Sequence, residues 1–233
     1  MPPYWRWEKG ASALLSCAVV ALTFPNVALA CDSKAPRHSK HLSMKQHDFY
    51  QQTRGAPAHP SLLQALEHWT GEPGLALDLG CGAGRDSLEL LRRGWRVQAI
   101  DAEARALAAL EAQVCVADRP RLHTVQARFD DLHLPIAQLI NASFALPFCA
   151  PSAFPGLWQR IENALDQGGL FAGHLFGERD PWRERGLLVH TREEAERLLR
   201  GWQVLSLDEH EWDGRTALGR AKHWHLLAFV ARR

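Results

Sequence analysis

The stretch that most constrains the fold runs from Leu75 to Ser87 and reads LALDLGCGAGRDS. A short apolar run that contains one acid, Asp78, breaks there into a turn with three glycines, Gly80, Gly82 and Gly84. Apolar residues then recur at helical spacing, so this order predicts a buried parallel strand, a glycine turn and the start of a helix. Glycines let the backbone approach a ligand closely, and the helix N-terminus offers free N–H groups and a partial positive charge.

The spacing of the glycines separates two ligand classes that use such a turn. Dinucleotide enzymes have the pattern G-x-G-x-x-G, or a final alanine in place of the last glycine. Here the sixth position is Arg85 when counted from Gly80 and Ser87 when counted from Gly82, and neither residue fits. The G-x-G-x-G spacing behind an acid suits a ligand with a zwitterionic amino-acid end and no pyrophosphate. A dinucleotide oxidoreductase and a structural turn in another α/β protein remain the alternatives.

A second acid lies where a nucleoside ligand requires one. The apolar segment Val97 to Asp101 reads as a strand that ends in Asp101. This acid lies about 20 residues beyond the first glycine, the spacing at which a carboxylate reaches ribose hydroxyls. The two stretches together favour a nucleoside-containing ligand.

The rest of the chain alternates apolar runs with amphipathic segments. Predicted helices cover 61–69, 86–93, 104–114, 158–165 and 191–200, and predicted strands cover 75–79, 97–101, 122–127, 138–145, 170–176, 202–211 and 222–230. Thr191 and Glu194 form a predicted capping box at the start of the last helix. Asp213, Gly214 and Arg215 are typical turn residues and predict the turn between the last two strands.

Composition excludes several other classes. The chain has 233 residues with 46% hydrophobic and 23% charged content, which is ordinary for a globular protein. Its net charge of +1 gives no basic field of the kind that nucleic-acid binders show. The five cysteines form no C-x-x-C pair, which fits a reducing compartment. His223 and His225 share a strand face, but a third metal ligand at suitable spacing is absent, so no metal is expected.

The N-terminal segment conflicts with that reducing compartment. Arg6 precedes an apolar run over 11–24, and Ala28-Leu29-Ala30 then meets Cys31, which is typical of a secretory signal peptide and is a poor match to a lipoprotein signal. Met44 offers an alternative translation start. We therefore expect residues 1–43 to be a leader, a signal-like or disordered extension, and 44–233 to be the functional domain. A cytoplasmic location is expected, and an exported or lipid-anchored protein is the alternative.

Several pieces of the chain together resemble one family. DLGCGAGRDS, NASFALPFC, LFGERDPW, LLRGW and KHWH are similar to the class I S-adenosylmethionine-dependent methyltransferases, in particular the bacterial tellurite-resistance and thiopurine-type enzymes that act on small molecules. The resemblance runs from about Met44 to the C-terminus. It implies a seven-stranded, mostly parallel, Rossmann-like sheet with helices on both faces and a C-terminal antiparallel hairpin. It also implies S-adenosyl-L-methionine as the cofactor.

The resemblance assigns roles to individual residues. The turn residues, from Asp78 through Gly80, Cys81 and Gly82 to Gly84, are expected to hold the methionine part of the cofactor, Asp101 the ribose, Phe129 and Asp130 the adenine, and Asn141 the region near the methyl group. Asp86 is expected to cap its helix and order the loop. Tyr50, Thr53 and Arg54 are candidates for a lid over the cofactor. Cys81 and Cys149 are interpreted as small buried residues.

Methyl transfer from a sulfonium is a direct displacement, so the protein mainly aligns the acceptor with the methyl group in a dry pocket. A base is needed only where the acceptor arrives protonated, and the sequence shows no conspicuous catalytic dyad, so the catalytic residues stay unknown. A soft sulfur, selenium or tellurium acceptor is the expectation that the resemblance implies. We expect a monomer that acts on a small molecule, not on nucleic acid, and has no stable membrane insertion. A non-catalytic cofactor-binding or scaffold protein of the same fold, including an exported one, is the alternative.

Overall fold

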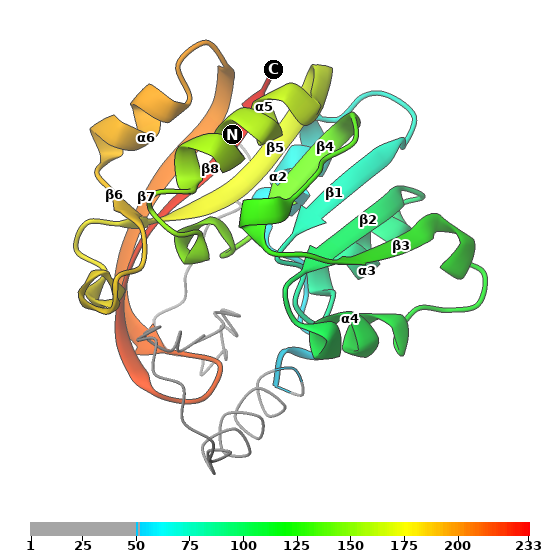
Figure 1. The fold of residues 1–233 in the computed structure, drawn as a ribbon, viewed down its shortest axis with the longest axis horizontal. Helices are drawn as coiled ribbons and strands as arrows, with labels where there is room; N and C mark the ends of the chain where they lie inside the picture. Colours follow the sequence, from blue (N-terminus) through cyan, green and yellow to red (C-terminus); the bar gives the residue numbers. More distant parts are fainter. Residues whose placement is uncertain (1–49, 51) are drawn as a thin grey trace, which may run out of the picture.

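The computed structural model describes residue 50 and residues 52–233, and the predictions for the leader, Cys31 and the start at Met44 lie outside this range (Figure 1). The strands are β1 (Leu75–Leu79), β2 (Arg96–Asp101), β3 (Leu122–Gln126), β4 (Ala137–Ala142), β5 (Leu165–Gly177), β6 (Val189–His190), β7 (Gln203–Arg215) and β8 (Ala221–Arg232). The α-helices are α2 (Pro60–His68), α3 (Arg85–Arg92), α4 (Ala104–Glu111), α5 (Phe154–Ala164) and α6 (Arg192–Leu198). Short 3-10 turns are η1 (Arg119–Arg121), η2 (Phe129–Asp131), η3 (Leu146–Phe148) and η4 (Pro181–Arg185).

The strands form one eight-stranded sheet with the order β3-β2-β1-β4-β5-β8-β7, and β6 pairs with β5. Pairing is parallel from β3 through β5, and antiparallel between β5 and β8 and between β8 and β7. The predicted fold class is therefore confirmed. The two-residue strand β6 was not predicted, because two residues carry no period that a pattern can detect.

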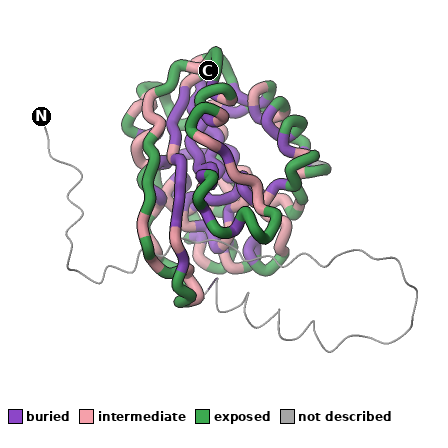
Figure 2. The backbone as a smooth tube through the Cα atoms, turned by 90° about the vertical axis from the view of Figure 1, so that its left-hand side faces the viewer, coloured by how far each residue is buried: buried purple, intermediate pink, exposed green. Residues whose placement is uncertain are grey.

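Helices cover both faces of the sheet (Figure 1). Side chains of α2, α3 and α4 pack with Ala76 in one core, and side chains of α5 and α6 pack with Leu77 in another. Ala76 and Leu77 are neighbours on β1 that point to opposite faces, and both are fully buried. A strand buried on both sides reads as a continuous apolar run, which is why the pattern of β1 was easy to recognise. Figure 2 shows the buried segments running through the middle of the molecule with exposed segments around them.

The predicted turn at Asp213 to Arg215 is wrong. These residues end β7, and Asp213 pairs with His223 across the hairpin. The chain turns at 216–220, where Thr216 N–H donates to Arg220 O at 2.8 Å and Gly219 has φ +77°. Trp212 stacks on Trp224 of the opposite strand with ring centroids 5.9 Å apart, and cross-strand pairs of this kind extend a hairpin past residues of weak strand propensity.

The predicted capping box at α6 is confirmed. The N–H of Glu194 donates to the Thr191 hydroxyl at 3.2 Å, and the N–H of Thr191 donates to Oε2 of Glu194 at 2.9 Å. This reciprocal pair satisfies N–H groups that a helix start leaves without intrahelical partners.

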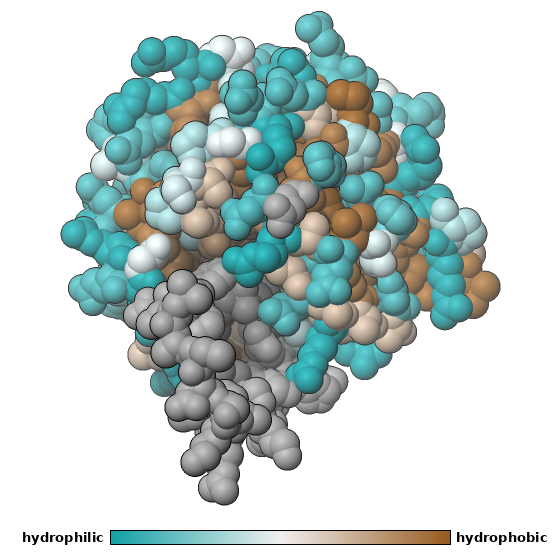
Figure 3. Space-filling view, viewed as in Figure 1, coloured by the Kyte–Doolittle hydropathy of each residue, from teal (hydrophilic) through white to brown (hydrophobic). Residues whose placement is uncertain are grey.

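The surface is mixed in character. Figure 3 shows one face as largely hydrophilic with separate hydrophobic patches. Val116, Ile136 and Val204 are the large hydrophobic side chains that are exposed in the described part of the chain. Within residues 50 and 52–233, no helix combines the length and the apolar character that crossing a bilayer requires.

Candidate functional site

A cavity of about 800 Å³ opens at the carboxyl ends of the parallel strands. Its lining contains the glycine turn after β1, the end of β2, the loop after β3 and the segment after β4. In an open α/β sheet this edge is where ligands bind, and the volume lies in the usual range for small-molecule sites. The predicted cofactor residues that line it are Asp78, Gly80, Cys81, Gly82, Asp101, Phe129 and Asp130.

Gly82 forms an open cradle in this cavity. Its φ is +54°, and a Cβ built on it would meet no heavy atom within 4 Å, so the space above the turn is clear for a ligand. Its N–H donates to Oδ2 of Asp101 at 2.9 Å, which joins the turn to the end of β2. The backbone is thus exposed to the cavity where a side chain would otherwise stand.

Gly84 has a different role from the one predicted for the turn. A Cβ there would lie 2.3 Å from Cδ1 of Leu110, so the missing side chain lets α3 approach α4. Gly84 does not line the cavity. Its contribution to a ligand site is indirect, through the position of the α3 N-terminus.

Two backbone N–H groups fix the orientation of the Asp101 carboxylate at the end of β2. Its Oδ1 accepts from the N–H of Glu103 at 2.9 Å, and its Oδ2 accepts from Gly82. Burial raises the pKa of Asp101, and the two backbone donors oppose that rise. A carboxylate fixed by its own backbone can accept hydrogen bonds from ligand hydroxyls without reorganising.

A buried polar network lies beneath the glycine turn and consists of His59, Asp78, Asp86, Ser87 and Asn141. Asn141 Nδ2 donates to Oδ1 of Asp78 at 2.8 Å and to Oδ2 of Asp86 at 2.9 Å. Ser87 Oγ donates to Oδ2 of Asp78 at 2.5 Å. Asn141 is fully buried and does not line the cavity, so its predicted contact with the region of the methyl group would be indirect.

The two carboxylates of this buried network have opposite pKa shifts. Burial, followed by the charge of Asp86, raises the pKa of Asp78 to about 7. Burial also acts to raise the pKa of Asp86, but the imidazole and backbone of His59 outweigh it and hold the pKa below its ordinary value. Two acids that share one amide therefore lose their protons at different pH values, Asp86 before Asp78.

His59 is a site residue that sequence reasoning missed. It lines the cavity, it is 5% exposed, and its ring contacts Asp86 through Nδ1 and Oδ2 at 2.9 Å. Its backbone N–H donates to Oδ1 of Asp86 at 2.8 Å, and Nη1 of Arg85 lies 3.1 Å from its Nε2. The two partners are 27 positions apart in the chain. The only sequence signal is the His-Pro pair before α2, which marks a helix start and not a catalytic group.

The candidate lid residues separate into two groups. Thr53 lines the cavity, whereas Tyr50 is buried beside Ala83 and Ala106. Burial, followed by the charge of Asp101, raises the pKa of the Tyr50 phenol. Arg54 is exposed and does not line the cavity. Their assignment as a lid stays a prediction.

The other end of the cavity is aromatic. Phe144, Phe148 and Trp182 line it. Trp182 is fixed by Asp180, whose Oδ1 accepts from the Trp182 N–H at 3.0 Å and whose Oδ2 pairs with the buried Lys222. The Lys222 Nζ also lies 3.7 Å from the ring centroid of Trp224, so this wall is braced by an ion pair and by cation–π contact.

The cysteines near the cavity are poor nucleophiles. Burial, followed by the charge of Asp101, raises the pKa of the Cys81 thiol well above its ordinary value. Burial raises the pKa of Cys149 to about 11. Because the thiolate is the reactive form, both observations favour the interpretation as small buried residues.

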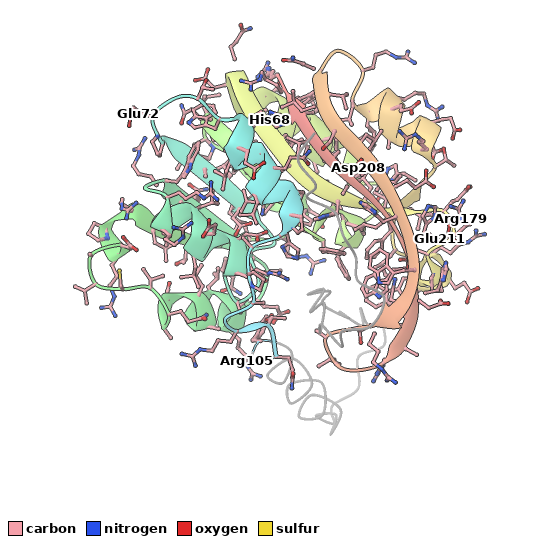
Figure 4. The ribbon with its side chains drawn as sticks, turned by 180° about the vertical axis from the view of Figure 1, so that it is seen from behind. His68, Glu72, Arg105, Arg179, Asp208 and Glu211 are labelled. Atoms are coloured by element: carbon pink, nitrogen blue, oxygen red, sulfur yellow. The ribbon has the colours of Figure 1, made fainter. Side chains whose placement is uncertain are left out.

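The histidines of the hairpin belong to a hairpin network in which His225 is buried and the other side chains are half-buried or exposed. Arg179 Nε donates to Oε1 of Glu211 at 2.9 Å, and these two residues lie together at the outer side of β7 (Figure 4). The other members are Glu209, Asp213, His223 and His225, with His223 Nδ1 2.8 Å from Asp213 Oδ1 and His225 Nε2 2.7 Å from Glu209 Oε1. Over the residues that the structure describes, no group of three or more histidine, cysteine or acidic side chains has an arrangement that could hold a metal ion.

The structure is an α/β fold with a cavity at the carboxyl edge of its parallel strands, lined by a glycine turn and by the strand-end acids Asp78 and Asp101. Residues 76–169 match a family model described as a methyltransferase domain. The chain therefore carries a methyltransferase domain, and the predicted resemblance and enzyme class are confirmed at that level.

Solved structures support the same fold. TehB from Haemophilus influenzae superposes with a TM-score of 0.67 at 17% identity, over 81% of this chain and 67% of that one. The 1,6-didemethyltoxoflavin-N1-methyltransferase of Burkholderia thailandensis, with bound 1,6-didemethyltoxoflavin and S-adenosylhomocysteine, superposes with a TM-score of 0.60 at 23% identity, over 87% of this chain and 93% of that one.

Curated relatives match over shorter parts of their length. The carboxy-S-adenosyl-L-methionine synthase of Dichelobacter nodosus is 29% identical over 163 residues, which are 66% of each chain. The ribosomal RNA small subunit methyltransferase C of Alcanivorax borkumensis is 53% identical over 49 residues, which are 21% of this chain and 15% of that protein. Together with the domain match, these similarities support S-adenosyl-L-methionine as the cofactor of the domain.

Proposed function

We propose that this protein transfers the methyl group of S-adenosyl-L-methionine to a small-molecule acceptor by direct displacement, as a cytoplasmic monomer. One observation carries the proposal. The cavity is one continuous space with two ends. Gly82 and Asp101 line the end that suits the cofactor, and Phe144 and Trp182 line the aromatic end. A two-substrate transfer needs such a shared space, because both reactants must meet in the same dry pocket.

The residues present fit this cofactor. The open cradle at Gly82 accepts backbone approach of a ligand, and the preset Asp101 carboxylate suits ribose hydroxyls. Phe129 and Asp130 lie on the cavity wall after β3, where an apolar contact and an acceptor for an amino group suit adenine. When bound, the sulfonium supplies a methyl group that is already activated for attack.

The protein's own contribution is alignment and exclusion of water. Phe144 and Trp182 are almost completely buried, and the Asp180–Lys222 pair holds the Trp182 wall in place. A rigid apolar wall lowers the cost of desolvating an attacking atom and limits its orientations. This alignment role requires no covalent intermediate with the protein.

A soft sulfur, selenium or tellurium nucleophile is the acceptor class that we propose to test first. The resemblance to tellurite-resistance and thiopurine-type enzymes supports it, and so does the polarisable aromatic wall. The net charge of +1 supports a small molecule over nucleic acid, which a basic surface would attract.

The proposal is tested with the full chain in two steps. The purified protein is denatured and searched by mass spectrometry for a co-purified nucleoside, and S-adenosylhomocysteine release is then followed with thiols, selenols and tellurite. We expect S-adenosylmethionine or its product on the protein and release with at least one acceptor. A protein that binds the cofactor and methylates none of a broad small-molecule panel would contradict the proposed activity and favour a non-catalytic binding protein.

A further inference from the structure

The contact between His59 and Asp86 has the geometry of a proton-accepting pair. The imidazole Nδ1 lies 2.9 Å from Oδ2 of Asp86, and the backbone N–H of His59 donates to Oδ1 at 2.8 Å. Both side chains are almost completely buried, and both residues line the cavity. The carboxylate therefore fixes the ring through two separate contacts.

The partner of the other ring nitrogen defines the tautomer. Nη1 of Arg85 lies 3.1 Å from Nε2 of His59, and a guanidinium can only donate. Nε2 must then carry the lone pair, and the ring proton sits on Nδ1, facing Asp86. Arg85 also lines the cavity, so the basic nitrogen is on the side of the ring from which an acceptor would approach.

The groups around the ring favour this arrangement. Asp86 accepts hydrogen bonds from the backbone N–H of His59 and from Asn141, and both contacts favour its ionised form. His174 of β5 has its ring centroid 5.7 Å from that of His59, and burial holds its pKa well below the ordinary value, so it is neutral. Arg85 is the cationic group at the ring, and Asp78 is linked to Asp86 through the Asn141 amide. An imidazolium formed at His59 would thus be paired with an existing carboxylate.

His59 lies away from Asp101, which is at the end of the cavity proposed for the nucleoside part of the cofactor. Its ring lies 5.2 Å from that of Phe144, which follows β4, whereas Asp101 ends β2. In the sheet β1 lies between β2 and β4, so Phe144 and Asp101 follow strands that are not neighbours. His59 is thus on the aromatic side of the cavity, where the acceptor is proposed to bind.

Other acids of the cavity are less suited to take a proton. Both carboxylate oxygens of Asp78 already accept hydrogen bonds, from Asn141 and from Ser87. Both oxygens of Asp101 accept from backbone N–H groups. Nε2 of His59 also accepts a hydrogen bond, but its donor is the side chain of Arg85, which lines the cavity and which an approaching acceptor can displace.

We propose that His59 is a general base, oriented by Asp86, that removes the proton of a thiol acceptor during methyl transfer. This inference rests on the proposed function. The acceptor S–H takes the place of Arg85 Nη1 as the donor to Nε2 of His59, and its proton moves to that nitrogen. The electron pair left on the acceptor sulfur forms the new bond to the methyl carbon. The bond between that carbon and the sulfonium sulfur breaks with its pair left on the sulfonium sulfur. The imidazolium then returns its proton to solvent through the cavity.

The test compares His59→Asn with the wild-type full chain. An asparagine amide can still donate to Asp86 from the position of Nδ1, but it has no group in place of Nε2. The matched control is His123→Asn, which changes an exposed histidine on β3. Rates are measured at pH 7 with benzyl mercaptan, which is mainly protonated, and with para-nitrothiophenol, which is already ionised. S-adenosylhomocysteine affinity is measured by calorimetry for each protein.

We expect His59→Asn to lower kcat with benzyl mercaptan by about 100-fold or more, the usual contribution of a general base. We expect its loss with para-nitrothiophenol to be at least roughly tenfold smaller, since that thiol needs no base. An equal loss with both thiols would overturn the proposal and leave His59 a structural residue. Turnover of neither thiol by a wild-type protein that binds S-adenosylhomocysteine would also overturn it. Failure to bind S-adenosylhomocysteine at all would instead contradict the proposed function.

Ring-nitrogen NMR of the histidines supplies a readout that needs no acceptor. His59 is assigned by the loss of its signal in His59→Asn. We expect the ring proton on Nδ1 and the lone pair on Nε2. A proton on Nε2, or on both nitrogens, would overturn the proposal because no lone pair would face the cavity.

Discussion

The buried network beneath the cavity and the hairpin network on β7 and β8 use the same kinds of side chain in opposite surroundings. In the buried network, burial and a neighbouring acid raise the pKa of Asp78 to about 7. In the hairpin network, the Arg179 guanidinium and then His223 lower the pKa of Glu211 to about 2. Apart from the buried His225, water screens and solvates the members of the hairpin network, whereas the buried network must satisfy every charge internally. The same kinds of side chain thus have shifted pKa values for opposite reasons, burial in the buried network and hydrogen bonds to cationic partners in the hairpin network.

The largest expected difference between the two networks is in stability. Asp86→Ala leaves His59 and Asn141 without their shared acceptor inside the protein, and we expect it to lower the free energy of unfolding by roughly 3–5 kcal/mol. Glu211→Ala is the matched change in the hairpin network, and we expect a shift within experimental error because the side chain is solvated. Denaturant unfolding of both variants measures the contrast, and similar losses would break it.

The pH dependence of stability sharpens the comparison. The folded pKa of Asp78, about 7, lies above its ordinary value of 3.8, so the folded state holds a proton that the unfolded chain has released. The contribution of Asp78 is therefore fully present below about pH 4 and is lost as the pH rises through about 7. We expect the free energy of unfolding of the wild type to fall over this window relative to Asp78→Asn, which cannot titrate. Parallel pH profiles for the two proteins would contradict the raised pKa.

Substitution of one glycine in the cavity and one in the hairpin turn is expected to give the smallest effects on stability and a difference only in ligand binding. Gly82 in the cavity and Gly219 in the hairpin turn both have positive φ, and a Cβ at either would meet nothing within 4 Å. We expect Gly82→Ala and Gly219→Ala each to cost about 1–2 kcal/mol of stability through backbone strain. Only Gly82→Ala should weaken S-adenosylhomocysteine binding in calorimetry, since only its methyl group would enter the cavity. Equal affinities for the two variants would mean that the turn does not approach the ligand.

Local sequence patterns predicted most strands and helices of the fold and the part of the site that lies at the glycine turn. Strand β1, the turn and the start of α3 follow one another within a few residues, so period and glycine spacing were sufficient to recognise them. The turn at 213–215 was misplaced because cross-strand pairing of Trp212 with Trp224 extends β7, and such pairing depends on residues distant in sequence.

Part of the site was missed for the same reason, namely that it depends on contacts between residues distant in sequence. His59, at the N-cap of α2, meets Asp86, in the first turn of α3, only in the folded chain, and no spacing rule joins residues 27 positions apart. Gly84 was grouped with its neighbours although it packs against Leu110 and not against the cavity. Sequence shows which residues are adjacent on one element, whereas the cavity is built from the ends of several.

We propose that the strand-end acid Asp101 and the glycine turn form the cofactor site of this methyltransferase domain. Calorimetry of S-adenosylhomocysteine binding to Asp101→Ala tests it most directly, with Asp208→Ala as the control on the far strand β7 (Figure 4). We expect Asp101→Ala to weaken binding roughly 10- to 100-fold, the value of hydrogen bonds to a charged acceptor, while Asp208→Ala binds as the wild type does. Wild-type affinity in a folded Asp101→Ala protein would contradict the assignment of Asp101 to the cofactor site.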